Sequence, residues 1–158
     1  MDTNELEIQP AKANDLGSIN QIISTAVMSW DLPERVKRLV LPSYYYTDVD
    51  LQFLKIYVII MHDKIIAVLA IDHHLINSQD KDILLIHGMY VHPGMQNCGV
   101  GRYLFKQAEQ LAKSKQANTL QVKAQKDAEG FFMRMGMKKI NCENNDNDYR
   151  HQYRKAII

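Results

Sequence analysis

Residues 89–102 place a glycine-rich loop between the end of an apolar run and the start of an amphipathic pattern. The segment reads Met89-Tyr90-Val91-His92-Pro93-Gly94-Met95-Gln96-Asn97-Cys98-Gly99-Val100-Gly101-Arg102. Such a loop favours anion binding, because the first N–H groups of a helix lack partners within the helix and its N-terminus carries partial positive charge. Glycines without a Cβ let an anion approach those groups closely. The segment therefore predicts a phosphate-binding site.

Two familiar phosphate motifs do not fit this segment. A Walker A loop needs Lys-Ser or Lys-Thr after its second glycine, whereas Gly94 and Gly99 are followed by Val100-Gly101. A dinucleotide-binding fingerprint that begins at Gly99 would need glycine or alanine at position 104, which is Leu104. The pattern that remains is Gln-x-x-Gly-x-Gly over residues 96–101.

The chain carries a second motif, Ala128-x-x-Phe131-Phe132-x-x-x-Gly136-Met137. Together with the Gln-x-x-Gly-x-Gly loop, the preceding Tyr-Val-His-Pro and the order of the predicted elements, it resembles the GNAT superfamily of acetyl-CoA-dependent N-acetyltransferases over nearly the whole chain. The family's form of the second motif is Ala-x-x-Phe-Tyr-x-x-x-Gly-Phe. The resemblance implies transfer of an acetyl group from acetyl-CoA, as co-substrate, to a primary amine by direct attack.

The resemblance also implies which residues bind the coenzyme. The backbone of the loop is expected to hold the pyrophosphate, and the main chain of the preceding strand to pair with the pantetheine arm and polarise the thioester carbonyl. The expected coenzyme-binding residues are Met89, Tyr90, Val91, Gln96, Asn97, Cys98, Gly99, Val100, Gly101 and Arg102. The alternative interpretation is that Gly99 and Gly101 merely permit a tight turn and close helix packing.

His87 is the candidate catalytic residue. An amine is mostly protonated at neutral pH and must lose a proton, so a base is needed near the thioester. Resembling enzymes often have a carboxylate near this position, and a histidine has a better-matched pKa. Strand alternation puts His87, Met89 and Val91 on one face unless a bulge intervenes. The alternative is a histidine that is satisfied within the sheet.

Phe132 departs from the family pattern, because it stands where a tyrosine often acts as the acid. Phenylalanine cannot donate a proton, so another group acts or the thiolate leaves unaided. Tyr90, Tyr103 and the run Tyr44–Tyr46 are candidate substitutes. Phe132 also supports an alternative function, an acyl-CoA-binding sensor or inactive module without turnover. A nucleotide-binding module is a third hypothesis, and it predicts competition by ATP better than by acetyl-CoA.

Other reactive side chains point to less specific interpretations. Cys98 at a helix N-terminus could carry the acetyl group as a nucleophile, although the family's usual route is direct attack by the amine. His73 and His74 are expected to face opposite sides of one strand, so they form no metal site together. No metal is expected.

The elements that position these residues follow from hydrophobic periodicity. Apolar residues three and four apart predict helices over 16–30, 34–40, 100–115 and about 128–135. Alternating or β-branched runs predict strands at 5–9, 56–61, 64–75, 83–92, 119–124, 137–142 and 149–158, with a hairpin turn at His62-Asp63, an irregular aromatic segment at 42–48 and an exposed loop at 144–148. This predicts an α/β fold, GNAT-like and mixed, with a mostly antiparallel central sheet of about seven strands flanked by about four helices.

Length and composition limit the remaining choices. The chain has 158 residues, which predicts a single domain over 1–158. A net charge of +1 argues against nucleic acid or an anionic membrane as a partner. Two distant cysteines, an acidic N-terminus and no apolar run of membrane-spanning length predict a cytoplasmic protein. The expected partner is a small-molecule or peptide amine bound against residues 30–50 and the end of the hairpin, and the expected state is a monomer or homodimer.

Overall fold

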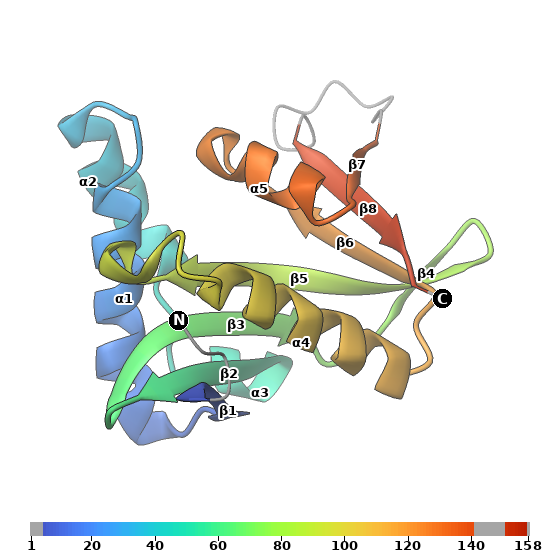
Figure 1. The fold of residues 1–158 in the computed structure, drawn as a ribbon, viewed down its shortest axis with the longest axis horizontal. Helices are drawn as coiled ribbons and strands as arrows, with labels where there is room; N and C mark the ends of the chain where they lie inside the picture. Colours follow the sequence, from blue (N-terminus) through green and yellow to red (C-terminus); the bar gives the residue numbers. More distant parts are fainter. Residues whose placement is uncertain (1–4, 141–150, 158) are drawn as a thin grey trace.

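The computed structural model describes residues 5–140 and 151–157. The described residues form eight strands and five α-helices: β1 (Glu7–Pro10), α1 (Leu16–Met28), α2 (Glu34–Tyr44), α3 (Asp50–Phe53), β2 (Leu54–Met61), β3 (Lys64–Asp72), β4 (Ile76–Ser78), β5 (Lys81–Val91), α4 (Val100–Ser114), β6 (Thr119–Lys123), α5 (Glu129–Arg134), β7 (Lys138–Lys139) and β8 (Gln152–Ala156). The strands make one sheet in the order β1-β2-β3-β5-β6-β8-β7, with β4 paired to β5 (Figure 1). Only β5 and β6 pair in parallel among these strands. The predicted mixed, mostly antiparallel α/β fold is confirmed.

Helices cover both faces of the sheet and bury two separate cores. The apolar side of α4, including Leu104 and Ala108, packs together with Phe132 of α5 in one core, which we call the α4 core. Ile19 and Ile23 of α1 belong to the other, the α1 core. Residues 67–71 of β3 alternate between the two cores, as side chains of a fully buried strand must.

The hairpin predicted at His62-Asp63 is confirmed, since both residues have positive φ angles, 51° and 63°, in the two-residue turn between β2 and β3. A second hairpin joins β4 to β5 through Gln79-Asp80, which also have positive φ angles. The sequence predicted only a polar gap there. The three-residue β4 is too short and too polar to show a strand pattern.

Two further differences from prediction lie between α1 and β2. Helix α2 continues through Pro42 to Tyr44, because a proline in the last turn removes one hydrogen bond without breaking the earlier turns. The hydroxyl of Ser43 donates to the Val40 carbonyl at 2.5 Å and satisfies one of the last carbonyl groups. The short helix α3 was not predicted; the Thr47 N–H donates to the Asp50 carboxylate at 2.8 Å beside it.

At the C-terminal side of the sheet, β8 lies between β6 and β7, so the last predicted strand is internal and β7 forms the edge. Strand β7 covers only part of the predicted segment 137–142. Residues 141–142 and the predicted loop at 144–148 lie outside the described residues.

The expectation for His73 and His74 is wrong in one respect. The two histidines follow the end of β3 in a bend, and their ring centroids lie 6.3 Å apart. Strand alternation therefore does not separate them. Among residues 5–140 and 151–157, no group of three His, Cys, Asp or Glu side chains could hold a metal ion.

The helices of the described part of the chain are all too short or too polar to cross a membrane.

Candidate active site

The sheet opens into a split between β5 and β6. The two strands pair from Ile83 with Thr119 to Ile86 with Val122. Beyond that point β5 pairs with β3 alone among the described strands, as far as Val91, and β6 continues beside β8. Figure 1 shows the two strands diverging from the end near β4. One edge of β5 therefore faces the split, and no strand of residues 5–140 and 151–157 pairs with it there.

The hydrogen-bond alternation of β5 tells which backbone groups lie on this open edge. The His92 N–H donates to the Ile66 carbonyl at 2.9 Å, which makes residue 92 a hydrogen-bonded position toward β3. In an antiparallel pair such positions alternate, so Met89 and Val91 direct their N–H and C=O groups away from β3. These groups can pair with an extended ligand in the split.

The strand leads through a short 3₁₀ turn at Pro93–Met95 into the N-terminus of α4. Gly99 caps this helix with φ of +87°, a left-handed backbone that glycine adopts without strain. The first helical hydrogen bond runs from the Tyr103 N–H to the Gly99 carbonyl at 3.0 Å. The N–H groups of the first turn, from Val100 to Arg102, are therefore positioned to bind an anion.

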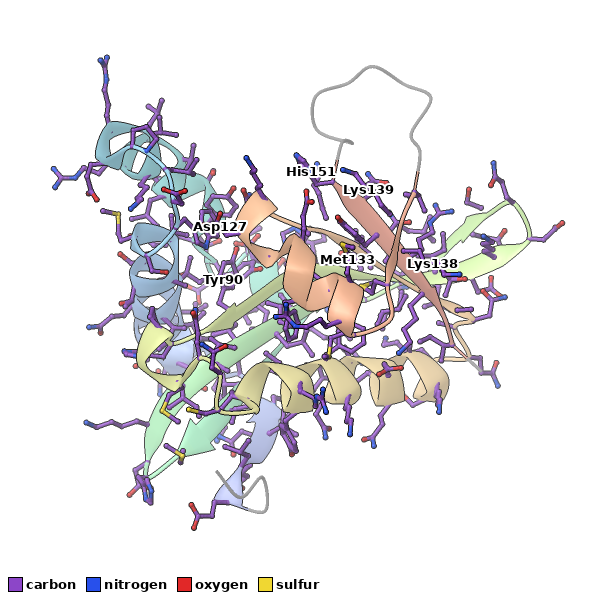
Figure 2. All side chains as sticks on the ribbon, turned by 45° about the horizontal axis from the view of Figure 1, so that its top comes forward. Tyr90, Asp127, Met133, Lys138, Lys139 and His151 are labelled. Atoms are coloured by element: carbon purple, nitrogen blue, oxygen red, sulfur yellow. The ribbon has the colours of Figure 1, made fainter. Side chains whose placement is uncertain are left out.

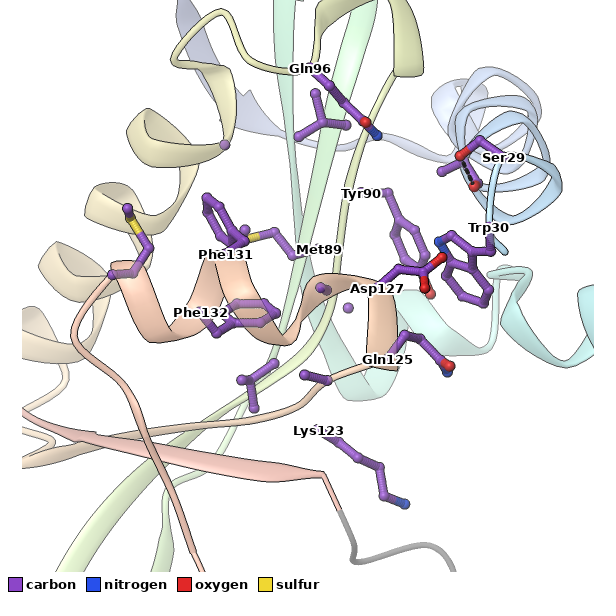
Figure 3. A pocket seen from close by; sticks show the side chains of 18 of the residues that line it. Ser29, Trp30, Met89, Tyr90, Gln96, Lys123, Gln125, Asp127, Phe131 and Phe132 are labelled. Atoms are coloured by element: carbon purple, nitrogen blue, oxygen red, sulfur yellow. Dashed lines mark hydrogen bonds between the residues drawn. The ribbon is translucent and has the colours of Figure 1, made fainter. Parts of the chain in front are cut away.

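A cleft of about 930 Å³ occupies the split. Its described lining comes from the end of α1 and the residues after it, the end of α2, β5, the loop before α4 and the first turn of α4, β6 and the segment after it, α5, and the residue before β8: Ala26, Ser29, Trp30, Tyr44, His87, Gly88, Met89, Tyr90, Val91, Gln96, Asn97, Gly99, Gly101, Arg102, Val122, Lys123, Ala124, Gln125, Asp127, Ala128, Phe131, Phe132, Arg134, Met135 and His151. Figure 3 shows Met89 directed toward Phe131, and Tyr90 toward Trp30. The two faces of β5 thus contribute to opposite walls.

Two of the expected coenzyme residues do not line the cleft with the others. Val100 is fully buried in the core beneath α4. The Cys98 thiol turns back and donates to the Gln96 carbonyl at 3.5 Å. Their backbone groups remain part of the loop, but the geometry gives no support to Cys98 as a nucleophile.

The cleft also contains residues outside the two motifs. Trp30 and Tyr44 belong to the segment 30–50 that was expected to bind the acceptor, whereas Gln125 and Asp127 were not predicted. Trp30 packs edge to face against Tyr44, with ring centroids 5.4 Å apart. The Gln125 amide donates to the Tyr44 hydroxyl at 2.6 Å, and the Asp31 N–H donates to the Asp127 carboxylate at 2.8 Å. Two hydrogen bonds therefore join the α1–α2 region to the segment after β6 across the cleft.

Charge in the cleft favours an anionic ligand. Arg102, Lys123 and Arg134 line it, whereas Asp127 is the single carboxylate among its described lining residues. Figure 2 shows Asp127 at the start of the α5 segment and His151 at the start of β8. The His151 ring forms an ion pair with Glu129 when it is protonated.

His87 occupies a β-bulge. Ala70 pairs with Gly88 and Ile71 pairs with Ile86, so His87 is the extra residue of β5 with no partner on β3. The bulge breaks the alternation that would place His87 on the face of Met89 and Val91. Those two side chains pack against the α4 core, whereas His87 contacts Tyr46 of the α1 core. The simple alternation fails here, and His87 still lines the cleft.

Tyr46 lies directly behind His87. Its hydroxyl is 3.3 Å from Nδ1 of His87, and the tyrosine is only 4% exposed. Burial raises the pKa of Tyr46 well above its ordinary value, and the neighbouring Tyr90 and Asp50 act in the same direction. Tyr46 is therefore a neutral phenol throughout the physiological pH range.

Gly88 makes room for Tyr46. A Cβ at residue 88 would overlap the Tyr46 hydroxyl and lie 2.9 Å from Cε2 of Tyr90. The absence of a side chain is therefore needed for the tyrosine to reach His87.

We expect Gly88→Ala to lower the free energy of unfolding by about 1–3 kcal/mol, because overpacking a buried site forces its neighbours to move. The loss should be smaller in a Tyr46→Phe background, since the overlapping atom is the hydroxyl and the ring carbon Cζ lies 3.5 Å away. Urea unfolding of the two single variants and the double variant measures this coupling. Equal losses in both backgrounds would contradict the contact.

We compared the chain with known protein families, sequences and structures. The acetyltransferase (GNAT) domain profile matches residues 38–155. A search of curated protein sequences found no match. The fold is similar to that of a PaiA N-acetyltransferase from Thermoplasma acidophilum in complex with coenzyme A, with a TM-score of 0.77 and 14% identity over 96% of this chain and 98% of that one.

Two further solved structures share the fold. A GNAT-family acetyltransferase from Staphylococcus aureus Mu50 has a TM-score of 0.72 and 12% identity over 97% of this chain and 99% of that one. A GNAT-family acetyltransferase from Brucella melitensis in complex with acetyl-CoA has a TM-score of 0.65 and 16% identity over 96% and 87%. Since the domain profile covers most of the chain, the chain belongs to the GNAT family of acetyltransferases.

Proposed function

We propose that this chain transfers the acetyl group of acetyl-CoA to a primary amine by direct attack of the amine on the thioester. The observation that carries the proposal is the split of β5 and β6, whose open edge leads straight into the anion-binding N-terminus of α4. An extended thioester arm and a pyrophosphate need these two features side by side.

The loop fits a pyrophosphate. Gly99 lines the cleft, and a Cβ there would meet no atom of the described residues within 4 Å, so the loop leaves room for a ligand beside its backbone. Arg102 and Arg134 supply positive charge to the same cleft. Gln96 and Asn97 line it, and Asn97 has a positive φ of 62° that turns the chain before the helix. We assign the pyrophosphate to this loop and the pantetheine arm to the open edge at Met89 and Val91.

The reaction needs a base and an oxyanion site. In the proposed mechanism, His87 accepts a proton from the attacking amine, whose nitrogen forms a bond to the thioester carbon. The carbonyl oxygen gains negative charge in the tetrahedral intermediate, and backbone N–H groups on the open edge of β5 stabilise it. The carbon–sulfur bond then breaks, and coenzyme A leaves as a thiolate.

The leaving thiolate needs no tyrosine at position 132. Phe132 is 4% exposed and packs against Phe131, with ring centroids 5.2 Å apart. Tyr44 and Tyr90 also line the cleft, and burial raises the pKa of both. A thiol with an ordinary pKa of about 8.5 leaves readily as a thiolate at neutral pH, so we propose unaided departure.

We expect Phe132→Tyr to leave turnover nearly unchanged, because thiolate departure is not the slow step in this mechanism. The measurement is thiol release with a detecting reagent at saturating acetyl-CoA. Phe53→Tyr on α3, where the ring is 67% exposed, is the matched control. A large gain in Phe132→Tyr alone would show that the natural enzyme lacks an acid.

The test of the function itself is turnover of acetyl-CoA with a panel of primary amines, followed by mass spectrometry of the acetylated product. Transfer to any amine supports the proposal. Acetyl-CoA binding without transfer to any member of a panel of small amines and peptides would favour the sensor or inactive module. Competition by ATP better than by acetyl-CoA would favour a nucleotide-binding module.

We propose that the acceptor is a small-molecule or peptide amine rather than a nucleic acid, because the net charge of +1 provides no strong basic field. We also propose that the protein is located in the cytoplasm and that it is a monomer or a homodimer. The location is supported by the free thiol of Cys98, which suits a reducing compartment.

A further inference from the structure

We propose that Tyr46 is a positioning residue for His87, and that its hydroxyl oxygen accepts a hydrogen bond from Nδ1–H so that Nε2 is left to take the proton of the amine. This inference rests on the role proposed for His87. It assigns a function to Tyr46, which lies in the segment after α2 and precedes His87 by 41 residues in the sequence.

Tyr46 is held rigidly enough to orient a second side chain. The amide side chain of Asn20 on α1 forms two hydrogen bonds with the backbone of Tyr46. Nδ2 of Asn20 donates to the Tyr46 carbonyl at 2.8 Å, and the Tyr46 N–H donates to Oδ1 of Asn20 at 2.9 Å. The ring is buried in the α1 core. Gly88 leaves the space into which the hydroxyl fits. The tyrosine is thus fixed before any substrate arrives.

His87 needs such a partner because it sits in a bulge. Its backbone lacks a partner residue on β3, and the side chain is exposed to the cleft. When the ring accepts a proton it becomes an imidazolium with two N–H groups, and Nδ1 must then donate. The Tyr46 hydroxyl oxygen lies 3.3 Å from that nitrogen and can accept its hydrogen. The contact therefore stabilises the ring most when it has taken the proton.

Several titratable and charged groups surround this pair. From β3, the Asp72 carboxylate faces His87 and His73, which oppose the rise in its pKa caused by burial. Tyr90 of β5 and Asp50 of α3 face Tyr46. Lys123 and His151 enter the cleft from the β6 and β8 side of the split. Asp72 is thus the acidic group that faces the imidazolium.

The kinetic test is Tyr46→Phe, which keeps the ring and the Asn20 contacts and removes only the hydroxyl. We expect kcat to fall roughly three- to tenfold, the size of one hydrogen bond, with the KM for acetyl-CoA unchanged. The acidic limb of the pH–rate profile should move to lower pH, because the protonated ring loses an acceptor. Tyr57→Phe, which removes a half-buried hydroxyl on β2, should change neither value.

The direction of this shift decides between the two arrangements of the hydrogen bond. If Tyr46 instead donates to Nδ1, its removal destabilises the neutral ring, and the acidic limb moves to higher pH. That result, or an unchanged profile together with unchanged kcat, would overturn the proposal.

A measurement without turnover separates this proposal from the proposed function. In the nitrogen spectrum of the ¹⁵N-histidine-labelled protein at high pH, with His87 assigned by its loss in His87→Gln, we expect Nδ1 to carry the hydrogen. An Nε2–H tautomer would overturn the role of Tyr46 even in an active acetyltransferase. A failure of acetyl transfer would overturn the proposed function even where the tautomer is as expected.

Discussion

Gly99→Val is expected to abolish the thermal protection that acetyl-CoA gives to the natural protein. A ligand that binds only the native state raises its stability by about 2.7 kcal/mol at 100 times its dissociation constant. For a chain of this size, that corresponds to roughly 5–10 °C in Tm. In the variant the valine side chain enters open space on the cleft side of the loop, where the pyrophosphate is expected.

The loss should come from binding and not from unfolding. A Cβ at Gly99 meets no atom within 4 Å, so the free protein bears only the strain of a β-branched residue at φ of +87°, on the order of 1–3 kcal/mol. Gly101→Val should lose the shift too, and it adds a clash because its Cβ would lie 3.1 Å from the Phe131 ring. Gly17→Val is the matched control, since a Cβ there also meets nothing within 4 Å.

The readout is Tm over a concentration series of acetyl-CoA for all four proteins. The natural protein and Gly17→Val should show a rising Tm, and the two loop variants should show a flat one. Normal coenzyme binding by both loop variants would mean that the pyrophosphate does not lie on this loop.

Local patterns in the sequence were sufficient for most of the fold. The three- and four-residue spacing of apolar positions predicted α1 and α4, because a helix packed on a sheet must bury one face. The two apolar runs around His62-Asp63 predicted the β2–β3 hairpin. The glycines at 99 and 101 predicted the loop at the start of α4, since its left-handed cap needs a residue without a Cβ.

The walls of the cleft could not be predicted in this way, because they form through contacts between distant segments. Asp31 and Asp127, whose hydrogen bond crosses the cleft, are 96 residues apart, and no local pattern pairs them. The bulge at His87 depends on how β5 fits against β3, so the alternation of residue types along β5 alone does not locate it. Gly88 was a signal that could have been used, since a glycine within an apolar strand often marks a bulge or a close approach.

Replacement of His87, the residue in the bulge, is expected to have the largest effect on turnover. His87→Ala is expected to lower kcat by roughly 10²–10⁴-fold, the usual contribution of a general base, with little change in the affinity for acetyl-CoA. We expect kcat to fall without a change in acetyl-CoA affinity because His87 projects toward Tyr46 on the α1 side of β5, whereas Met89 and Val91 project toward the α4 core. A group on the α1 side can reach the amine without contributing to the coenzyme contacts of the loop.

The pH dependence distinguishes a base from a residue that only shapes the cleft. The acidic limb of the pH–rate profile should disappear in His87→Ala, because the group whose protonation blocks the reaction is gone. His74→Ala is the matched control, since this histidine lies outside the cleft in the exposed bend after β3 and should change neither rate nor profile. An acidic limb that persists in His87→Ala would assign it to the amine or to another residue. Asp72 would then be the next group to replace, because its carboxylate, at the end of β3, interacts electrostatically with His87.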